Sequence, residues 1–135
     1  TDAEEFITQI HVNLTAPWLL TQACLPVLRK AENASVVFVC EDLSRVNKAY
    51  WGAYGIAKAG LEGLVRMLHD ETEEPVVRIS VLPPGPMRTS IRSRAYVEEA
   101  ATHCPEAAVY APACVYLLSA QGAAERGRIL RPQVG

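Results

Sequence analysis

The sequence predicts an α/β fold in which helices cover both faces of a parallel sheet. Apolar side chains recur at helical spacing in two long segments, 3–30 and 50–73. Each segment is followed by a short apolar run rich in β-branched residues, at 35–40 and 76–82. Helices that alternate with buried strands are typical of a sheet whose strands run parallel.

The first long helix is expected over 3–30. Asp2 followed by Glu5 resembles a capping box, with Asp in the place of Ser or Thr. Pro17 and Pro26 lie inside this helix and should bend it. Pro17 also lacks the N–H that would bond to the carbonyl four residues earlier, so that carbonyl is expected to be free.

The remaining elements follow from the same patterns. Small residues recur along the helix at 50–73 and would let another backbone approach closely. The residues 127–130 are expected to form a last short strand. The other predictions are a loop at 44–48, a polar loop after residue 86, a short helix at 96–101 and a helix that begins near Pro112.

Composition restricts the classes of protein that fit. The chain has 135 residues, of which 50% are apolar and 21% charged, so it forms one small globular domain at most. A net charge of −2 offers no basic field for nucleic acid. No apolar run approaches the roughly 18 residues of a membrane span. The four cysteines lack a C-x-x-C pattern and read as buried, reduced thiols of a cytoplasmic protein.

Tyr54 and Lys58 stand four residues apart in the second predicted helix. At this spacing both side chains lie on one helix face. A nearby ammonium stabilises phenolate, so Lys58 is expected to lower the pKa of Tyr54. A tyrosine of this kind gives or takes a proton near neutral pH. The pair therefore predicts a proton-transfer site, and the alternative is a surface Tyr and Lys of an amphipathic helix.

The order of motifs around this pair resembles the second half of a classical short-chain dehydrogenase/reductase. Asn13 lies upstream, a strand precedes Tyr54-x-x-x-Lys58, and the segment PGPMRT at 84–89 follows the next strand. The resemblance implies a partial doubly wound, Rossmann-type sheet of about three strands with the N-terminal half absent. Residues 1–135 would then be the C-terminal part of one NAD(P)-binding domain.

The resemblance also implies an activity. The family transfers hydride between NAD or NADP and a small carbonyl or alcohol substrate. Tyr54 matches the family's acid/base, and Lys58 matches the lysine that holds the nicotinamide ribose. Asn13 matches an asparagine whose main-chain carbonyl holds a water in the proton relay.

Further expectations concern the cofactor wall and assembly. Pro84, Gly85 and Thr89 match the segment that meets the nicotinamide, and the alternative is an ordinary turn formed by the prolines and Gly85. Family members associate as homodimers or tetramers through the two long helices. The chain alone is expected to be an incomplete enzyme, and its strand at 36–40 would expose an edge that favours association.

The chain departs from the family at the serine. Glu41 stands 13 residues before Tyr54, where the family has Ser. A carboxylate there would raise the pKa of the phenol and repel an oxyanion on the substrate. Either Glu41 points away, or a protonated Glu41 donates a hydrogen bond in place of the serine. The alternative function is a non-catalytic module that binds a nucleotide or a partner or forms dimers.

The histidines and a group of arginines are also candidates for site residues. The three histidines show no metal-ligand spacing, so no metal site is expected. Arg88, Arg92 and Arg94 fall where the family has a substrate-covering loop. They either favour an anionic substrate or belong to a solvated loop.

Overall fold

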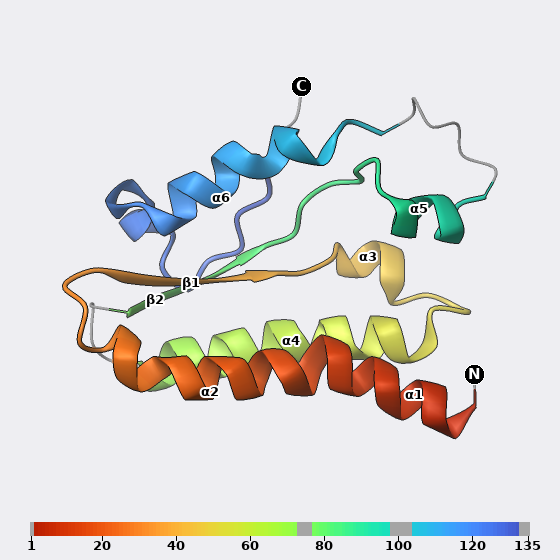
Figure 1. Cartoon of the computed structure of the whole chain (residues 1–135), viewed down its shortest axis with the longest axis horizontal. Coiled ribbons are helices and arrows are strands. Elements are labelled where there is room, and N and C mark those ends of the chain that lie inside the picture. Colours follow the sequence, from red (N-terminus) through yellow and green to blue (C-terminus); the bar gives the residue numbers. More distant parts are fainter. Residues whose placement is uncertain (1, 73–76, 98–103, 133–135) are drawn as a thin grey trace.

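The chain forms three layers, with a parallel sheet between two layers of helices (Figure 1). The computed structural model describes residues 2–72, 77–97 and 104–132. Its elements are, in order, α1 (Ala3–Ile10), the π-helical turn η1 (His11–Thr15), α2 (Ala16–Leu28), β1 (Ala34–Val39), α3 (Leu43–Val46), α4 (Gly52–Glu71), β2 (Val77–Leu82), α5 (Ser90–Ala95), the 3-10 turn η2 (Ala107–Tyr110), α6 (Ala111–Leu118) and the 3-10 turn η3 (Ala120–Glu125).

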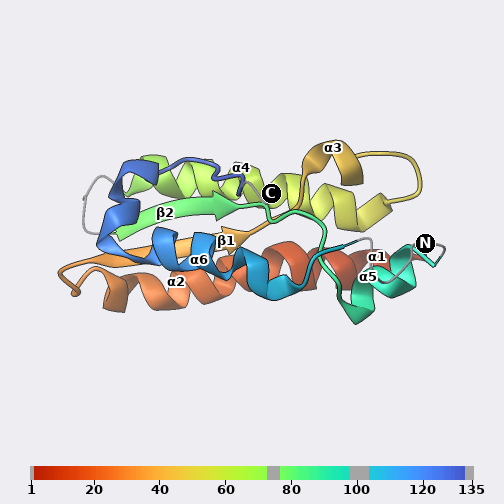
Figure 2. The ribbon, with the colours of Figure 1, turned by 90° about the horizontal axis from the view of Figure 1, so that it is seen from above.

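The sheet confirms the predicted parallel α/β architecture. β1 and β2 pair in parallel, with Ala34 opposite Val77 and Val39 opposite Leu82. Ile129 forms a single parallel bridge with Val81 on the other side of β2. The predicted third strand at 127–130 is therefore reduced to one bridge in the described residues. Seen from above, α6 lies over β1, while α4 and α2 lie deeper, on the β2 side and the β1 side of the sheet (Figure 2).

The core lies between the sheet and the layer of α1, α2 and α4. Its buried apolar side chains come from both strands and from the inner faces of α2 and α4, and they are Leu25, Phe38, Leu61, Val65, Leu68, Val77, Ile79 and Val81. Every residue of β2 is buried, as expected for a strand with covered faces and neighbours on both edges. The buried guanidinium of Arg78 donates to Ser35 Oγ at 2.7 Å and to the carbonyl of Ser119 at 2.6 Å.

The first long helix is continuous in direction but changes its hydrogen-bond pattern in the middle. Asp2 caps it as predicted, because its carboxylate accepts the N–H of Glu5 at 2.9 Å. In η1 the bonds reach five residues back, as the N–H of Ala16 bonds to the carbonyl of His11. The widened turn lies directly before Pro17, which sits in the first turn of α2, where its missing N–H has least consequence.

Several predicted boundaries differ from the structure. The segment expected as a loop at 44–48 contains α3, because the Asp42 carboxylate caps it by accepting the N–H of Ser44 at 3.0 Å. The second long helix begins at Gly52, since Tyr50 has a positive φ of 72°. The prediction of a helix at 96–101 is wrong at its start, where Tyr96 already ends α5.

The helix α5 was expected to be part of a polar loop. Thr89 starts it, because its hydroxyl accepts the N–H of Arg92 at 3.2 Å. The rest of the predicted helix, at 98–101, lies outside the described residues, as do the predicted ends of the long helix at Glu73 and of the strand at Val76. None of the described helices is both long enough and apolar enough to cross a membrane.

Candidate active site

A cavity of about 460 Å³ opens where β1 and β2 end. The carboxyl ends of parallel strands are the usual place for ligands in α/β folds. We call it the Tyr54 cavity. Its walls come from the ends of both strands, from α4 and α5, and from α1, and the residues that matter below are Gln9, Cys40, Glu41, Arg45, Trp51, Tyr54, Lys58, Pro84, Gly85, Thr89, Arg92 and Tyr96.

Tyr54 and Glu41, which both line this cavity, are hydrogen-bonded to each other. The Tyr54 hydroxyl donates to Glu41 Oε1 at 2.9 Å, so Glu41 does not point away from the tyrosine. Burial raises the pKa of Tyr54 well above its ordinary value, and the neighbouring carboxylate of Glu41 raises it further. The expected effect of a carboxylate on this phenol is thus confirmed.

Lys58 does not act on Tyr54 as predicted. Its Nζ lies 5.5 Å from the centroid of the tyrosine ring, over the face of the ring. The pKa of Tyr54 is raised, not lowered, because burial and Glu41 dominate its surroundings. Tyr54 is therefore a protonated hydrogen-bond donor in this arrangement, and Lys58 remains one helical turn away on the same helix.

Neither of the two serines nearest in sequence, Ser44 and Ser35, replaces the missing serine. Ser44 is exposed, and its hydroxyl donates to Asp42 Oδ1 at 2.7 Å. That carboxylate also caps α3, so both residues serve the local fold. Ser35, at the far end of β1, accepts a bond from Arg78 at 2.7 Å. Neither serine lines the Tyr54 cavity.

Asn13 lies outside the Tyr54 cavity, on the far side of Lys58. Its side-chain amide donates to the carbonyl and to Oε1 of Gln9, each at 3.1 Å. Gln9 lines the Tyr54 cavity, whereas Asn13 lines a second hollow, and Lys58 lines both. The structure thus arranges Tyr54, Lys58 and Asn13 in that order across the two hollows.

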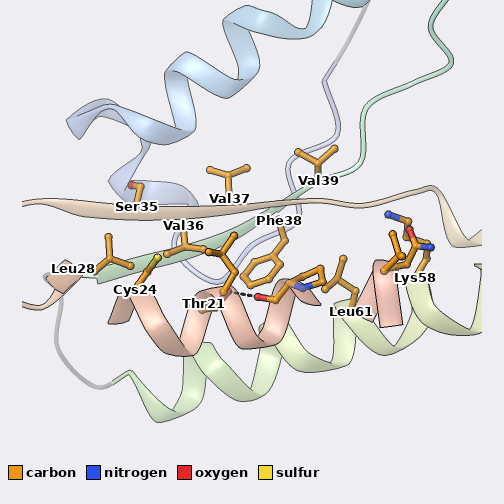
Figure 3. A pocket seen from close by; sticks show the side chains of 14 residues that line it. Thr21, Cys24, Leu28, Ser35, Val36, Val37, Phe38, Val39, Lys58 and Leu61 are labelled. Atoms are coloured by element: carbon orange, nitrogen blue, oxygen red, sulfur yellow. Dashed lines mark hydrogen bonds between the residues drawn. The ribbon is translucent and has the colours of Figure 1, made fainter. Parts of the chain in front are cut away.

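The second hollow runs between β1 and α2 and has a volume of about 450 Å³. We call it the β1 groove. Val36 and Phe38 point from the strand toward α2, and Lys58 lies at one end (Figure 3). Its walls are mostly apolar and include Leu20, Cys24, Leu28, Val36, Phe38 and Leu61. Among the described residues, β1 pairs with β2 alone, so its other edge faces this groove.

The loop after β2 brings Pro84, Gly85 and Thr89 to the Tyr54 cavity. The Tyr110 hydroxyl donates to the carbonyl of Pro86 at 2.9 Å and fixes the loop from outside. A Cβ placed on Gly85 would lie 2.5 Å from this hydroxyl oxygen, so a larger residue would displace the Tyr110 side chain. The Thr89 hydroxyl is already used to cap α5.

Several residues at the site were missed by the sequence analysis. Gln9 stands four residues before Asn13, a spacing at which amide side chains bond along a helix, so it was detectable. Trp51 packs its ring 5.8 Å from that of Tyr54 and 6.2 Å from that of Tyr96. The position of Tyr96 depends on α5 and on tertiary contacts, and no local pattern marks it.

The three arginines of the predicted covering loop separate in the structure. Arg92 lines the Tyr54 cavity, with its guanidinium 4.1 Å from the centroid of the Tyr96 ring. Arg88 and Arg94 are exposed. The solvated-loop interpretation thus describes Arg88 and Arg94, and Arg92 is the arginine at the site.

Comparison with known proteins places this geometry in a family. Residues 1–100 match the family described as short chain dehydrogenase. The uncharacterized oxidoreductase YciK of Escherichia coli K12 is 38% identical over 90 residues, which cover 67% of this chain and 35% of YciK. A bovine 3-oxoacyl-[acyl-carrier-protein] reductase is 29% identical over 91 residues, 67% of this chain and 38% of the reductase.

Solved structures agree with the family match. A short chain dehydrogenase from Salmonella enterica superimposes with a TM-score of 0.92 at 31% identity, covering 98% of this chain and 55% of that one. A structure from Escherichia coli CFT073, described as a short chain dehydrogenase complexed with NADPH, gives a TM-score of 0.92 at 30% identity over 99% of this chain and 55% of that one. The chain spans about half the length of these structures and 35% of YciK. The chain belongs to the short chain dehydrogenase family.

Proposed function

We propose that the full-length protein is an NAD(P)-dependent oxidoreductase that transfers hydride to or from a small organic substrate in the Tyr54 cavity. The observation that carries this proposal is the convergence of Tyr54, Lys58 and the loop at 84–89 on one cavity at the strand ends. A carbonyl/alcohol pair is the substrate class that the family resemblance implies. NAD or NADP is the cofactor, since solved relatives include complexes with NADP and NADPH.

The described residues fit the nicotinamide end of such a cofactor. The cavity volume of about 460 Å³ lies in the range of small-molecule sites. Pro84, Gly85 and Thr89 would form the wall against the nicotinamide, and Lys58 would hold the ribose. When bound, the cofactor supplies or accepts the hydride. The sequence contains no glycine-rich phosphate turn, so these residues account for only one end of the dinucleotide.

Tyr54 is proposed to donate the proton to the substrate, or to accept it in the reverse reaction. Its hydroxyl holds a proton at Oη, because its pKa is raised and Glu41 accepts its hydrogen bond. Lys58 lies between this cavity and the β1 groove, where Asn13 and its partner Gln9 continue the series of polar groups. This arrangement supports a proton path from Tyr54 past Lys58 toward Asn13, with the main-chain carbonyl of Asn13 as the proposed water ligand.

The test is turnover by the full-length protein with NADPH and with NADH. A panel of aldehydes, ketones and imines is supplied, and the loss of absorbance of the reduced nicotinamide is followed. Tyr54→Phe should lower the rate about 10² to 10⁴-fold, as for loss of a general acid. Cofactor binding, read from nicotinamide fluorescence, should persist in the variant. An unchanged rate in Tyr54→Phe would contradict the role of Tyr54.

A second candidate function is favoured by one observation, the Tyr54–Glu41 bond. It engages the phenol that would otherwise face the substrate, and it raises the pKa of that phenol. A member that retains the fold but not the chemistry would bind nucleotide or a partner through the same surfaces. Cofactor binding without turnover of any substrate in the panel would support this candidate over the first.

The exposed apolar faces of α2 and α4 and the free cysteines bear on assembly and location. Large apolar side chains on the outer faces of α2 and α4 are exposed, including Leu20 at 67%, Val27 at 69% and Met67 at 58%. Such a face suits packing against a second copy, so we propose a homodimer or tetramer through these helices. All four cysteines are free thiols, which supports a reducing, cytoplasmic location.

A further inference from the structure

Glu41 is the one acidic side chain among the described residues that line the Tyr54 cavity. Its Oε1 lies 2.9 Å from the Tyr54 hydroxyl, so an atom within hydrogen-bond reach of the phenol is also beside the carboxylate. We infer that the reacting group of the substrate is a C=N bond, bound as a protonated iminium by Glu41. This inference rests on the proposed function, because it assumes hydride transfer in this cavity.

Among the residues that the structure describes, Glu41 lines the cavity without an ion-pair partner. In the described residues the ion pair joins Arg66 and Glu62 of α4 at 3.7 Å, and Glu41 forms none. Arg45, Lys58 and Arg92 line the same cavity, and no ion pair joins any of them to Glu41. The negative charge therefore acts locally, at the Tyr54 hydroxyl, while the basic side chains stand elsewhere on the wall.

This local charge opposes reduction of a ketone. When hydride adds to a C=O carbon, negative charge develops on the oxygen, and an effective site places hydrogen-bond donors around it. Here the position next to Tyr54 holds an acceptor instead of a donor. The carboxylate would repel the forming alkoxide, and the phenol beside it is a weak acid because its pKa is raised.

The same charge favours a C=N bond. A carboxylate next to the nitrogen stabilises the protonated iminium, which accepts hydride more readily than the neutral imine. In the reduction, the carbon gains a hydride with its two electrons, which the reduced nicotinamide loses, and the nitrogen keeps its proton and becomes a neutral amine. In the reverse oxidation, Glu41 stabilises the cation that forms as hydride leaves the carbon. Glu41 thus occupies the position of the serine, but it stabilises positive charge on the substrate where a hydroxyl donor would stabilise negative charge.

The experiment compares two substrates of matched ring size with the full-length protein and NADPH, a methylpyrroline as the imine and methylcyclopentanone as the ketone. The wild type should reduce the imine and leave the ketone nearly unchanged. Glu41→Gln keeps the shape but removes the charge, and it should lower the imine rate about 10²-fold. Glu41→Ser should raise the ratio of ketone to imine turnover above that of the wild type.

A second readout needs no turnover. Methylpyrrolidine, the saturated amine, is cationic at neutral pH and should bind near Trp51, whose ring lies 5.8 Å from that of Tyr54. Its affinity, followed by tryptophan fluorescence with Trp51→Phe as the control for signal assignment, should fall in both Glu41→Gln and Glu41→Ser.

The outcomes separate this inference from the function on which it rests. Faster turnover of the ketone than of the imine by the wild type, or equal binding of the amine by wild type and Glu41→Gln, would overturn the C=N assignment and leave the oxidoreductase intact. Absence of turnover with either substrate, in the wild type and in Glu41→Ser alike, would overturn both.

Discussion

The Tyr54 cavity and the β1 groove have nearly the same volume, about 460 Å³ and about 450 Å³, and Lys58 and Val39 line both. Their walls differ in chemistry. The cavity holds a phenol and a carboxylate bonded to each other at the ends of the strands. The groove is walled by apolar side chains, and the Thr21 hydroxyl in it donates to the carbonyl of Pro17 on its own helix at 2.8 Å (Figure 3).

The difference shows that size does not identify a reactive site. The cavity offers titratable groups close to one another, which suits a small polar substrate. The groove follows one unpaired edge of β1 within the described residues, which suits a strand or another apolar surface. Changes in the groove should therefore alter stability and association, whereas changes in the cavity should alter chemistry.

The largest effect is expected from Phe38→Ala, in the wall of the β1 groove. Phe38 is 6% exposed and packs in the main core, so its truncation should lower the free energy of unfolding by about 3 to 5 kcal/mol. Urea unfolding of the full-length protein measures this change. Val115→Ala is the matched surface control, since Val115 is 66% exposed, and it should change stability by less than about 0.5 kcal/mol.

The division predicts that Phe38→Ala leaves the turnover rate per folded molecule close to that of the wild type. A loss below about 1 kcal/mol would show that the site collapses around the missing ring. A selective loss of turnover at full stability would place Phe38 in the chemistry and break the comparison.

Lys58→Met should give the next largest effect, because Lys58 is the charged residue that lines both hollows. Loss of its ammonium beside Tyr54 should lower turnover of the full-length protein about 10²-fold, the scale for one electrostatic group. Stability should change little, since the side chain is half-buried at the surface of two hollows. Lys30→Met, at an exposed lysine beyond α2, is the control and should leave turnover unchanged.

Much of the fold was predictable because its signals are local. Apolar periodicity gave α4, and the β-branched runs gave β1 within one residue at each end and β2 at its C-terminal end, Leu82. The π-helical turn at His11–Thr15 was not predictable, since Pro17 signals only a disturbance, not which hydrogen bonds replace the lost one. The helix α5 was missed because its start depends on a single threonine cap.

At the candidate site, the sequence identified residue types better than their electrostatics. Tyr54, Lys58 and the loop at 84–89 do meet around one cavity. The prediction that Lys58 lowers the pKa of Tyr54 was wrong, and the prediction that Glu41 raises it was right. Burial and the 2.9 Å hydrogen bond to Glu41 outweigh a cation placed over the tyrosine ring. Helical spacing says that two side chains share a face, not which of their atoms meet.

A third prediction concerns Cys40, a buried thiol at the cavity. Burial raises its pKa from 9.0 to about 11, against the lowering effect of Lys58. The folded state thus holds this proton more tightly than the unfolded state. The stabilisation of the folded state by this protonated thiol is complete below about pH 9. It should be lost as the pH rises toward about 11, which lowers the free energy of unfolding by roughly 2 kcal/mol.

Urea unfolding of the full-length protein at a series of alkaline pH values measures the slope. Cys40→Ala should be less stable throughout but should show a flatter dependence on pH in this window. Alkylation at neutral pH gives an independent reading, since the exposed Cys24 should react and the buried Cys40 should not. An equal rate for the two thiols would contradict the raised pKa.

The smallest change in stability is expected from Val39→Lys, at the end of β1 where the two hollows meet. Val39 is 54% exposed, so the substitution should alter the free energy of unfolding by about 0.5 kcal/mol or less. Its effect should appear in association instead, because a lysine on an open edge opposes pairing with another strand. Light scattering of the 135-residue chain should show association for the wild type and less of it for Val39→Lys. Ile91→Lys, on the exposed face of α5 away from the edge of β1, is the control and should associate like the wild type. A wild-type chain that is a stable monomer would show that the β1 groove does not drive association.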